Sequence, residues 1–287
     1  MKNDSHNLRY GAVYTLYKPP ADFLERIRSV IETCDAIILV DNTPGGAKIE
    51  INDSKILLLQ DGSNKGIASA LNMGISKARE CDVNFLVLFD QDSSPDTDTL
   101  RKLFVAASKH RKALIGPLFV DDQAGLIRSA VETDEHSPVG CLPTSGMTFN
   151  LDDMPADMQF NEQFFLDFVD FDWCWRLSAL GWTCLLANQI PMRHRLGLAQ
   201  RKFLFITYHV PEPYRHYFQF RDAIKLTGLS YVPLYSKFRL TLIILPKLVV
   251  YPFLLGSGTE RLKWMIRGLY DAVRNVGGIG AAKERLS

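Results

Sequence analysis

Four apolar runs in the first third of the chain constrain the fold more than any other feature. They cover residues 11–17, 36–40, 55–59 and 83–89, and amphipathic segments at 22–33 and 67–80 lie between them. A strand that is apolar along its whole length is buried on both faces, which is typical of a parallel sheet covered by helices. The pattern therefore predicts an α/β fold built from βαβ units.

Polar residues follow three of these runs directly. In open α/β sheets, ligands bind beyond the carboxyl ends of the strands. We therefore expect one edge of the sheet to carry the chemistry, with Lys18, the Asp41–Asn42 pair and the Asp90–Asp92 triplet.

Asp90 and Asp92 give the strongest local signal. Two carboxylates two residues apart, where a strand turns, can both reach one hard cation. Mg²⁺ and Mn²⁺ are typically held by one or two carboxylates together with substrate phosphates. The alternative is a solvated turn, because residues 93–96 resemble a helix cap.

A second signal is Asn64-Lys65-Gly66 at the start of the 67–80 helix. Glycine permits a close backbone approach, and free amides at a helix start favour phosphate groups. A packed helix with one glycine contact is the structural alternative.

Acidic residues flanked by aromatic residues form a third signal at 168–176. In a sheltered cleft, Asp170 or Asp172 would have the raised pKa of a general base. The alternative is an ordinary helix start, with both acids near its positive end and Arg176 paired to Asp172. His194, between two arginines, is either a metal or phosphate contact or a surface histidine.

Several classes of protein lack support. The chain contains no G-x-G-x-x-G, no P-loop and no G-x-S-x-G motif, which disfavours nicotinamide dehydrogenases, P-loop enzymes and α/β-hydrolases. Its five cysteines form no C-x-x-C pair, which fits a reducing compartment rather than a disulfide or zinc framework. The first residues have no apolar stretch, so we expect no secretory signal.

The net charge of +1 conceals an asymmetry. Residues 1–192 contain 17 Lys and Arg against 27 Asp and Glu, and residues 193–287 contain 16 against 5. A basic C-terminal part suggests an anionic membrane surface or another polyanion as partner, although solvated charges placed by chance are the alternative. The near-neutral total argues against a nucleic-acid partner bound by bulk charge.

The basic part also contains the most apolar stretch, residues 240–255. It is short for a spanning helix and contains Lys247 and two prolines, so we expect an interfacial or re-entrant segment or a buried helix pair. Residues 259–276 predict a basic amphipathic helix. Peripheral membrane association follows as a hypothesis, and packing on the rest of the chain or a homodimer interface is the alternative.

Taken in order, seven segments resemble the family 2 inverting glycosyltransferases, and three of them resemble the rhamnosyltransferase branch. The resemblance implies the GT-A fold, a Rossmann-like mixed sheet that binds a nucleotide sugar, over residues 1–202, with a helical basic extension over 203–287. The segments are AVYTLYKP (12–19), ILVDNTP (38–44), NKGIASALNMGI (64–75), LFDQDS (88–93), TSGM (144–147), FLDFVDFDWCWRLSALGW (165–182) and HRLG (194–197).

The resemblance also assigns roles. Asp170 matches the catalytic aspartate, and Val169 stands where the family has a glutamate, so Asp172 is a substitute candidate. Asp92 and His194 match the residues that hold Mg²⁺ or Mn²⁺ with the donor diphosphate. The donor nucleotide would be contacted by Thr15, Asp41 (at the nucleobase), Asn64, Lys65, Gly66 and Asp90.

The implied reaction is inverting transfer of L-rhamnose from dTDP-β-L-rhamnose. The implied acceptor is a cell-surface polysaccharide such as O-antigen, or a lipid-linked glycan, at the cytoplasmic face of the membrane. Two alternatives stay open: a family 2 transferase that uses a UDP-hexose, and a non-catalytic membrane-surface subunit of glycan assembly.

Overall fold

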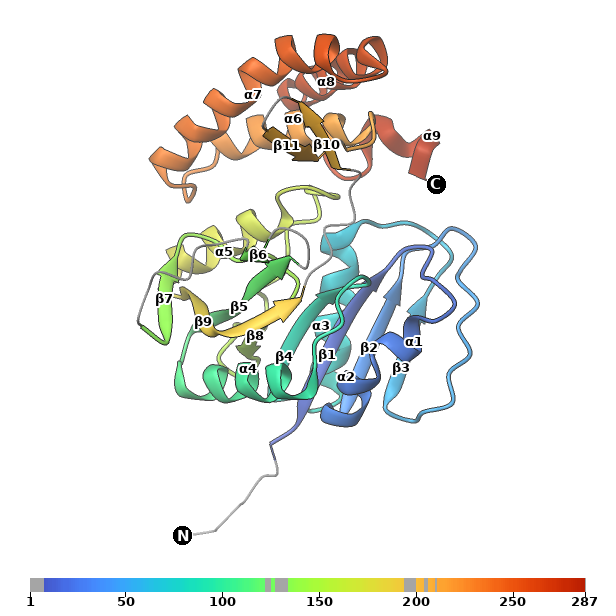
Figure 1. Ribbon diagram of the computed structural model, residues 1–287, viewed down its shortest axis with the longest axis vertical. Helices are drawn as coiled ribbons and strands as arrows, with labels where there is room; N and C mark the ends of the chain where they lie inside the picture. Colours follow the sequence, from blue (N-terminus) through green and yellow to red (C-terminus); the bar gives the residue numbers. More distant parts are fainter. Residues whose placement is uncertain are drawn as a thin grey trace. The chain divides into compact units, whose positions relative to one another are not determined.

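The computed structural model divides into two compact units, each of which is described by itself (Figure 1). Unit 1 comprises residues 1–63, 70–159 and 180–195, and unit 2 comprises residues 64–69, 160–179 and 196–287. The structure describes residues 8–121, 125–126, 134–193, 200–203, 206–209 and 211–286.

Unit 1 is built on a mixed sheet with the strand order β3-β2-β1-β4-β8-β5-β9-β7, and β6 lies beside β5. The first four strands in this order are mutually parallel, β8 is antiparallel to both of its neighbours, and β5 and β9 are parallel. The strands are β1 (Tyr10–Leu16), β2 (Ala36–Asp41), β3 (Ile56–Gln60), β4 (Phe85–Asp90), β5 (Ala113–Asp121), β6 (Gly125–Leu126), β7 (His136–Val139), β8 (Met147–Asn150) and β9 (Thr183–Arg193).

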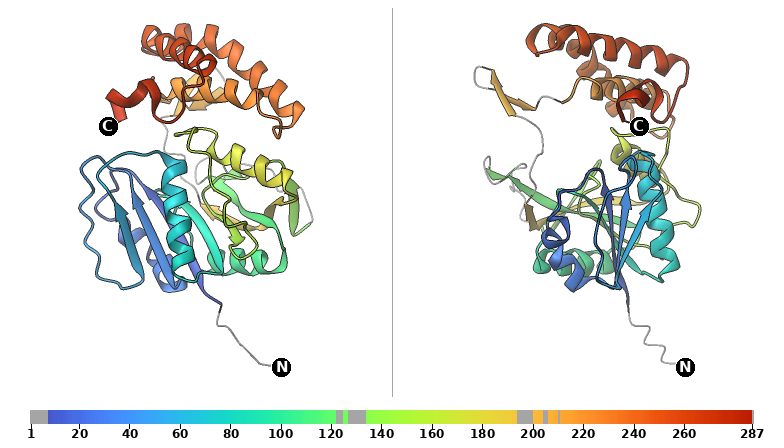
Figure 2. Two further views of the ribbon diagram at one scale, coloured as in Figure 1. Left: turned by 180° about the vertical axis from the view of Figure 1, so that it is seen from behind. Right: turned by 90° about the vertical axis from the view of Figure 1, so that its right-hand side faces the viewer.

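Helices cover both faces of this sheet (Figure 2). On one face, α1 (Phe23–Arg26), α2 (Arg28–Thr33) and α4 (Thr97–Lys109) bury their apolar sides against alternate residues of β1, β2 and β4. On the other face, α3 (Ile67–Glu80) lies so close to β1 that a Cβ added at Gly74 would be 2.3 Å from Val13 Cγ1.

The α/β class and the four predicted strands are confirmed, with each strand starting and ending within two residues of the predicted bounds. The helix predicted over 22–33 is two helices instead. The interruption falls at Ile27, whose φ of −99° and ψ of 16° are not helical and whose side chain is fully buried.

Unit 2 is mainly helical. The prediction of helices after residue 203 is confirmed for four α-helices but misses a short hairpin, β10 (Gln200–Phe203) with β11 (Ile206–His209), because neither strand has an apolar run. The helices of the unit are α5 (Val169–Ala179), α6 (Arg215–Thr227), α7 (Leu234–Leu254), α8 (Gly258–Val273), a 3₁₀ turn (Gly280–Ala282) and α9 (Lys283–Leu286).

The apolar stretch at 240–255 forms one continuous helix, α7, with Pro246 and Pro252 inside it. The structure therefore has one helix where the sequence predicted a helix pair or a re-entrant segment, and the interfacial alternative stays a hypothesis. One side of α7 packs on α6 and α8 through Leu240, Ile244 and Leu248. Within the described part of the chain, no helix combines the length and apolar character needed to cross a membrane.

Candidate active site

Three of the predicted site residues in unit 1 lie together at the carboxyl edge of the parallel strands. In the β1–β4 register Thr15 is opposite Asp90, and in the β1–β2 register Leu16 is opposite Asp41. Thr15 is 8% exposed and Asp41 is 2% exposed, while Asp90 is half-buried. The sheet register thus fixes the positions of these side chains relative to one another.

The loops beyond these strands are tied to each other by hydrogen bonds. The Tyr17 amide donates to Gln91 Oε1 over 2.8 Å, which joins the loop after β1 to the turn after β4. The Lys18 amide donates to Thr43 Oγ1 over 2.7 Å, which joins it to the loop after β2. Gln91, the middle residue of the Asp90–Asp92 triplet, therefore holds two loops together.

Asp41 orders the loop that follows β2. Its Oδ1 accepts a hydrogen bond from the Thr43 amide over 3.0 Å, and its Oδ2 accepts one from the Ala47 amide over 2.6 Å. A nucleobase contact by Asp41 would use the remaining lone pairs of a carboxylate that the backbone already holds in place.

A tight turn carries the Asp90–Asp92 triplet. The Ser93 amide donates to the Asp90 carbonyl over 3.0 Å, and the Ser93 hydroxyl bonds the hydroxyl of buried Ser145 in the TSGM segment. Asp96 caps α4 by accepting from the Thr99 amide over 2.7 Å. The predicted helix cap is therefore present at Asp96, and the exposed Asp92 lies in the turn that precedes it.

The donor set at this turn fits a hard divalent cation that is shared with a substrate. Asp92 is exposed and Asp90 is half-buried, so both carboxylates can meet a ligand at the surface. Among the residues that the structure describes, no group of three or more His, Cys, Asp or Glu side chains could hold a metal ion. Two carboxylates completed by diphosphate oxygens is the arrangement that Mg²⁺ typically accepts. His194 lies outside the described residues.

Gly66 in unit 2 makes the close approach that its sequence context predicts, and the partner is the protein itself. Its φ is +86°, and a Cβ added there would lie 2.6 Å from the Phe165 carbonyl oxygen. The Ile67 amide donates to that carbonyl over 2.9 Å, and the Gly66 amide donates to Asn64 Oδ1 over 3.1 Å. These two amides at the start of α3 are therefore not free for a phosphate group, while the Lys65 side chain is exposed.

Asp170 lies in the first turn of α5, directly after Phe168 with its left-handed φ of +65° and the buried Val169. Its Oδ1 accepts a hydrogen bond from the Phe171 amide over 2.9 Å. Burial raises the pKa of Asp170 to about 6, opposed by backbone hydrogen bonds and reinforced by the nearby Asp167 carboxylate. A carboxylate with this pKa is suited to accept a proton near neutral pH.

Asp172 has different surroundings. Its side chain is fully buried, and it accepts hydrogen bonds from the Tyr231 hydroxyl and, over 3.4 Å, from Arg176 Nη1. Burial raises the pKa of Asp172, and the bonds from Tyr231 and Arg176 oppose that shift. The ordinary helix pair with Arg176 is present, and the carboxylate is closed off from solvent.

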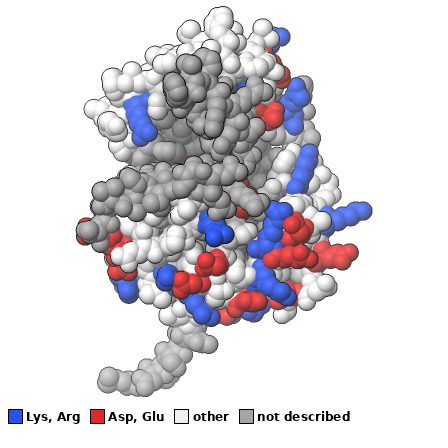
Figure 3. All heavy atoms as spheres, in the orientation of Figure 1, with Lys and Arg blue, Asp and Glu red and all other residues white. Residues whose placement is uncertain are grey.

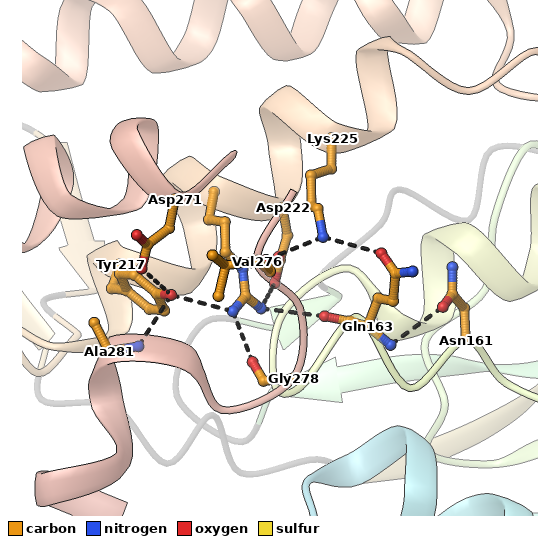
Figure 4. Close-up of polar contacts among 10 residues, drawn as sticks. Asn161, Gln163, Tyr217, Asp222, Lys225, Asp271, Val276, Gly278 and Ala281 are labelled. Carbon is orange, nitrogen blue, oxygen red and sulfur yellow. Dashed lines mark hydrogen bonds and ion pairs between the residues drawn. The ribbon is translucent and has the colours of Figure 1, made fainter. Parts of the chain in front are cut away.

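Polar contacts from α6 support the loop that leads into α5 (Figure 4). The fully buried Arg221 donates to the Gln163 carbonyl over 3.2 Å, to the Gly278 carbonyl over 2.7 Å and to Asp222 in an ion pair of 2.6 Å. Lys225 Nζ donates to Gln163 Oε1 over 3.0 Å. Arg221 therefore joins α6, the segment before α5 and the C-terminal segment.

Sequence reasoning missed the long-range partners of Asp172 and of Asp167, which lies just before α5. Arg215 at the start of α6 forms an ion pair of 3.0 Å with Asp167, and Tyr231 binds Asp172. The two pairs join residues 48 and 59 positions apart. No local pattern in the sequence signals such contacts.

Comparison with known proteins agrees with this architecture. Residues 15–142 match the family model described as glycosyl transferase family 2. The chain is 25% identical over 291 residues to dTDP-rhamnosyl transferase RfbF of Shigella flexneri, covering 96% of this chain and 98% of the relative.

Solved structures of glycosyltransferases share the fold. A crystal structure of Staphylococcus aureus TarS 1-349 in complex with UDP-GlcNAc superposes with a TM-score of 0.57 at 13% identity, covering 97% of this chain and 83% of that chain. A crystal structure of GalNAc-T7 with UDP, GalNAc and Mn²⁺ superposes with a TM-score of 0.54 at 12% identity. That match covers 95% of this chain, which spans 59% of the GalNAc-T7 chain.

The strand order and the solved structures of glycosyltransferases show that the chain has the GT-A fold. The match of residues 15–142 to the glycosyl transferase family 2 model and the similarity to dTDP-rhamnosyl transferase RfbF agree with the ordered motifs.

Proposed function

We propose that the protein transfers L-rhamnose from dTDP-β-L-rhamnose to a glycan acceptor with inversion at the anomeric carbon. The observation that carries this proposal is the similarity to RfbF, a dTDP-rhamnosyl transferase, which extends over 96% of this chain and 98% of the relative. A lipid-linked glycan is the acceptor that we propose, as an intermediate of a cell-surface polysaccharide.

Asp170 is the proposed general base. Its half-buried carboxylate, with a pKa of about 6, accepts the proton of the acceptor hydroxyl as that oxygen attacks the anomeric carbon. The new glycosidic bond forms on the face opposite the breaking bond to the diphosphate, so the anomeric configuration inverts. Asp172 is the weaker candidate, because Tyr231 and Arg176 already occupy its buried carboxylate.

On the donor side, we propose that Asp90 and Asp92 hold the divalent cation together with the diphosphate, with His194 as a further ligand. When bound, such a cation neutralises charge on the leaving diphosphate. Thr15 and Asp41 at the strand ends are the proposed contacts of the nucleoside, and Asn64, Lys65 and Gly66 are proposed to lie near the nucleotide.

The test is a transfer assay with purified protein, Mn²⁺ and a soluble acceptor analogue. The donors compared are dTDP-rhamnose, UDP-glucose, UDP-galactose and a GDP-sugar, and thermal stabilisation by each donor is the second measurement. Selective turnover and stabilisation with dTDP-rhamnose supports the proposal. Turnover with a UDP-hexose alone replaces the rhamnose donor and keeps the mechanism.

The site is tested separately with Asp92→Ala and Asp170→Asn. Asp98→Asn is the matched control, because Asp98 is an exposed acid on α4 that pairs with Lys102. Loss of turnover in the first two variants and not in the control supports the site. Unchanged transfer in both site variants would refute the proposed site.

A further inference from the structure

Helix α7 is apolar on two opposite sides. One side is in the core of unit 2, where Leu240, Ile244 and Leu248 pack with residues of α6 and α8. A surface helix of a globular protein has one apolar side and one polar side. The second apolar side of α7 therefore needs its own explanation.

This second side forms a continuous stripe. Its residues recur every three or four positions, which places them on one face along the whole helix. The ends of the stripe are the most exposed, at 83% for Leu234 and 84% for Phe253. We call this set the α7 stripe: Leu234, Phe238, Leu242, Leu245, Val249 and Phe253.

The neighbouring helix α8 repeats the pattern on a smaller scale. Ile266, Tyr270 and Val273 are exposed at spacings of four and three residues. The Arg267 and Arg274 guanidinium groups lie over the Tyr270 ring, 5.5 and 5.3 Å from its centroid. Apolar and aromatic groups bordered by arginines are typical of a helix that lies in a membrane interface.

Charge distinguishes between the occupants that could cover this surface. Helix α7 contains Lys237 and Arg239 near its start and no acidic residue, while its third basic residue, Lys247, is half-buried near Asp167. A second copy of the chain would place this basic helix against itself, whereas a surface of anionic lipids complements it. In Figure 3 the described side chains at the top of the view are mostly white, with isolated charged side chains.

The start of α7 adds an observation that points to a lipid. Leu234, Tyr235, Lys237, Phe238 and Thr241 line a groove of about 590 Å³. Four of its lining side chains offer apolar or methyl groups, and Lys237 brings the one charge. An acyl chain with an anionic headgroup matches that combination.

We propose that the α7 stripe and the exposed face of α8 bind the surface of a membrane that contains anionic lipids. The helices lie in the interface plane, with the apolar residues among the acyl chains and the basic residues at the headgroups. This surface lies in unit 2, and the proposal does not depend on which sugar is transferred. It would bring the enzyme to a lipid-linked acceptor.

Sedimentation of the full-length protein with vesicles tests the proposal. We expect strong partitioning to vesicles of phosphatidylcholine with phosphatidylglycerol, weaker partitioning to phosphatidylcholine alone, and a decrease with added salt. Phe238→Gln, Val249→Gln and Phe253→Gln should each lower the partition coefficient about tenfold, because each removes an apolar side chain from the acyl layer.

Substitution of the basic residues measures the electrostatic contribution to vesicle binding separately from the apolar contribution. Arg239→Gln and Arg274→Gln should each lower partitioning to anionic vesicles about fivefold and leave partitioning to neutral vesicles unchanged. Val105→Gln is the matched control, since Val105 is a 51% exposed apolar residue on α4 of unit 1. All of these substituted side chains are exposed, so folding should be retained.

Two results would overturn the proposal. One is a wild-type protein that does not sediment with anionic vesicles at low salt. The other is a dimer, seen by light scattering, that the three α7 stripe substitutions dissociate, which would assign the surface to a second copy. Activity on the soluble acceptor analogue does not involve vesicles, so failure here is distinguishable from failure of the proposed transfer reaction.

Discussion

The two units hold their acidic residues in different ways. In unit 1, the strand register places Thr15 opposite Asp90, and backbone amides hold Asp41. In unit 2, Tyr231 from a distant part of the sequence binds Asp172, the Phe171 amide holds Asp170, and both acids are more deeply buried than Asp92. The strands and their loops therefore position the donor-side acids, whereas tertiary packing buries the acids on α5 and raises their pKa values.

The largest effect that we expect separates the two acids of α5. Asp170→Asn should lower kcat by about 10²–10⁴-fold, the usual contribution of a general base, while the free energy of unfolding stays close to the wild-type value. Asp172→Asn should destabilise the protein, because the buried carboxylate bonds Tyr231 and Arg176. Steady-state kinetics and urea unfolding of both variants measure this. Equal kinetic losses in two stable variants would contradict the assignment.

A comparably large effect on stability is expected at Arg221, which is fully buried and paired to Asp222. Arg221→Met leaves that carboxylate buried without its partner, which typically costs about 3–5 kcal/mol of unfolding free energy. Urea unfolding measures the loss.

The double variant Arg221→Met/Asp222→Leu is the control for this prediction. Because it removes both charges, it should recover a large part of the lost stability. If the double variant is as unstable as the single one, the hydrogen bonds to the Gln163 and Gly278 carbonyls matter more than the unpaired charge.

The pH dependence of transfer sharpens the contrast between buried and exposed acids. Asp170 must be ionised to accept a proton, and burial raises its pKa to about 6. We expect kcat/KM to be constant above that pH and to fall about tenfold per pH unit below it. The measurement is a pH profile of kcat/KM from about pH 5 to 8. A kcat/KM that stays constant down to about pH 5, as for an exposed carboxylate with a pKa of about 4, would contradict the predicted environment.

The contrast between the two units also explains which features of the structure could be predicted from the sequence. The first four strands of unit 1 could be predicted because each is a local apolar run, and the clustering of Thr15, Asp41 and Asp90 follows from their parallel order. The long-range partners of Asp167 and Asp172 could not be predicted, since Arg215 is 48 residues from Asp167 and Tyr231 is 59 residues from Asp172. Likewise, the apolar character of α7 is visible in the sequence, but which side is buried depends on α6 and α8.

The smallest effect that we expect concerns the hydroxyl of Tyr231. Tyr231→Phe removes one donor to the fully buried Asp172, which should cost about 1–3 kcal/mol of unfolding free energy. Because Arg176 still donates to the same carboxylate, the loss should lie toward the lower end of that range. Tyr235→Phe is the matched control, since the Tyr235 side chain is 75% exposed on α7.

Kinetics of the Tyr231→Phe variant give a second test of whether Asp170 or Asp172 is the general base. If Asp172 only supports α5, the variant should keep a kcat within a few-fold of the wild type and the same acid limb in its pH profile. If Asp172 took the proton, loss of the Tyr231 hydrogen bond would raise the pKa of Asp172 and move the acid limb upward. A shifted limb with unchanged stability would therefore assign the base to Asp172.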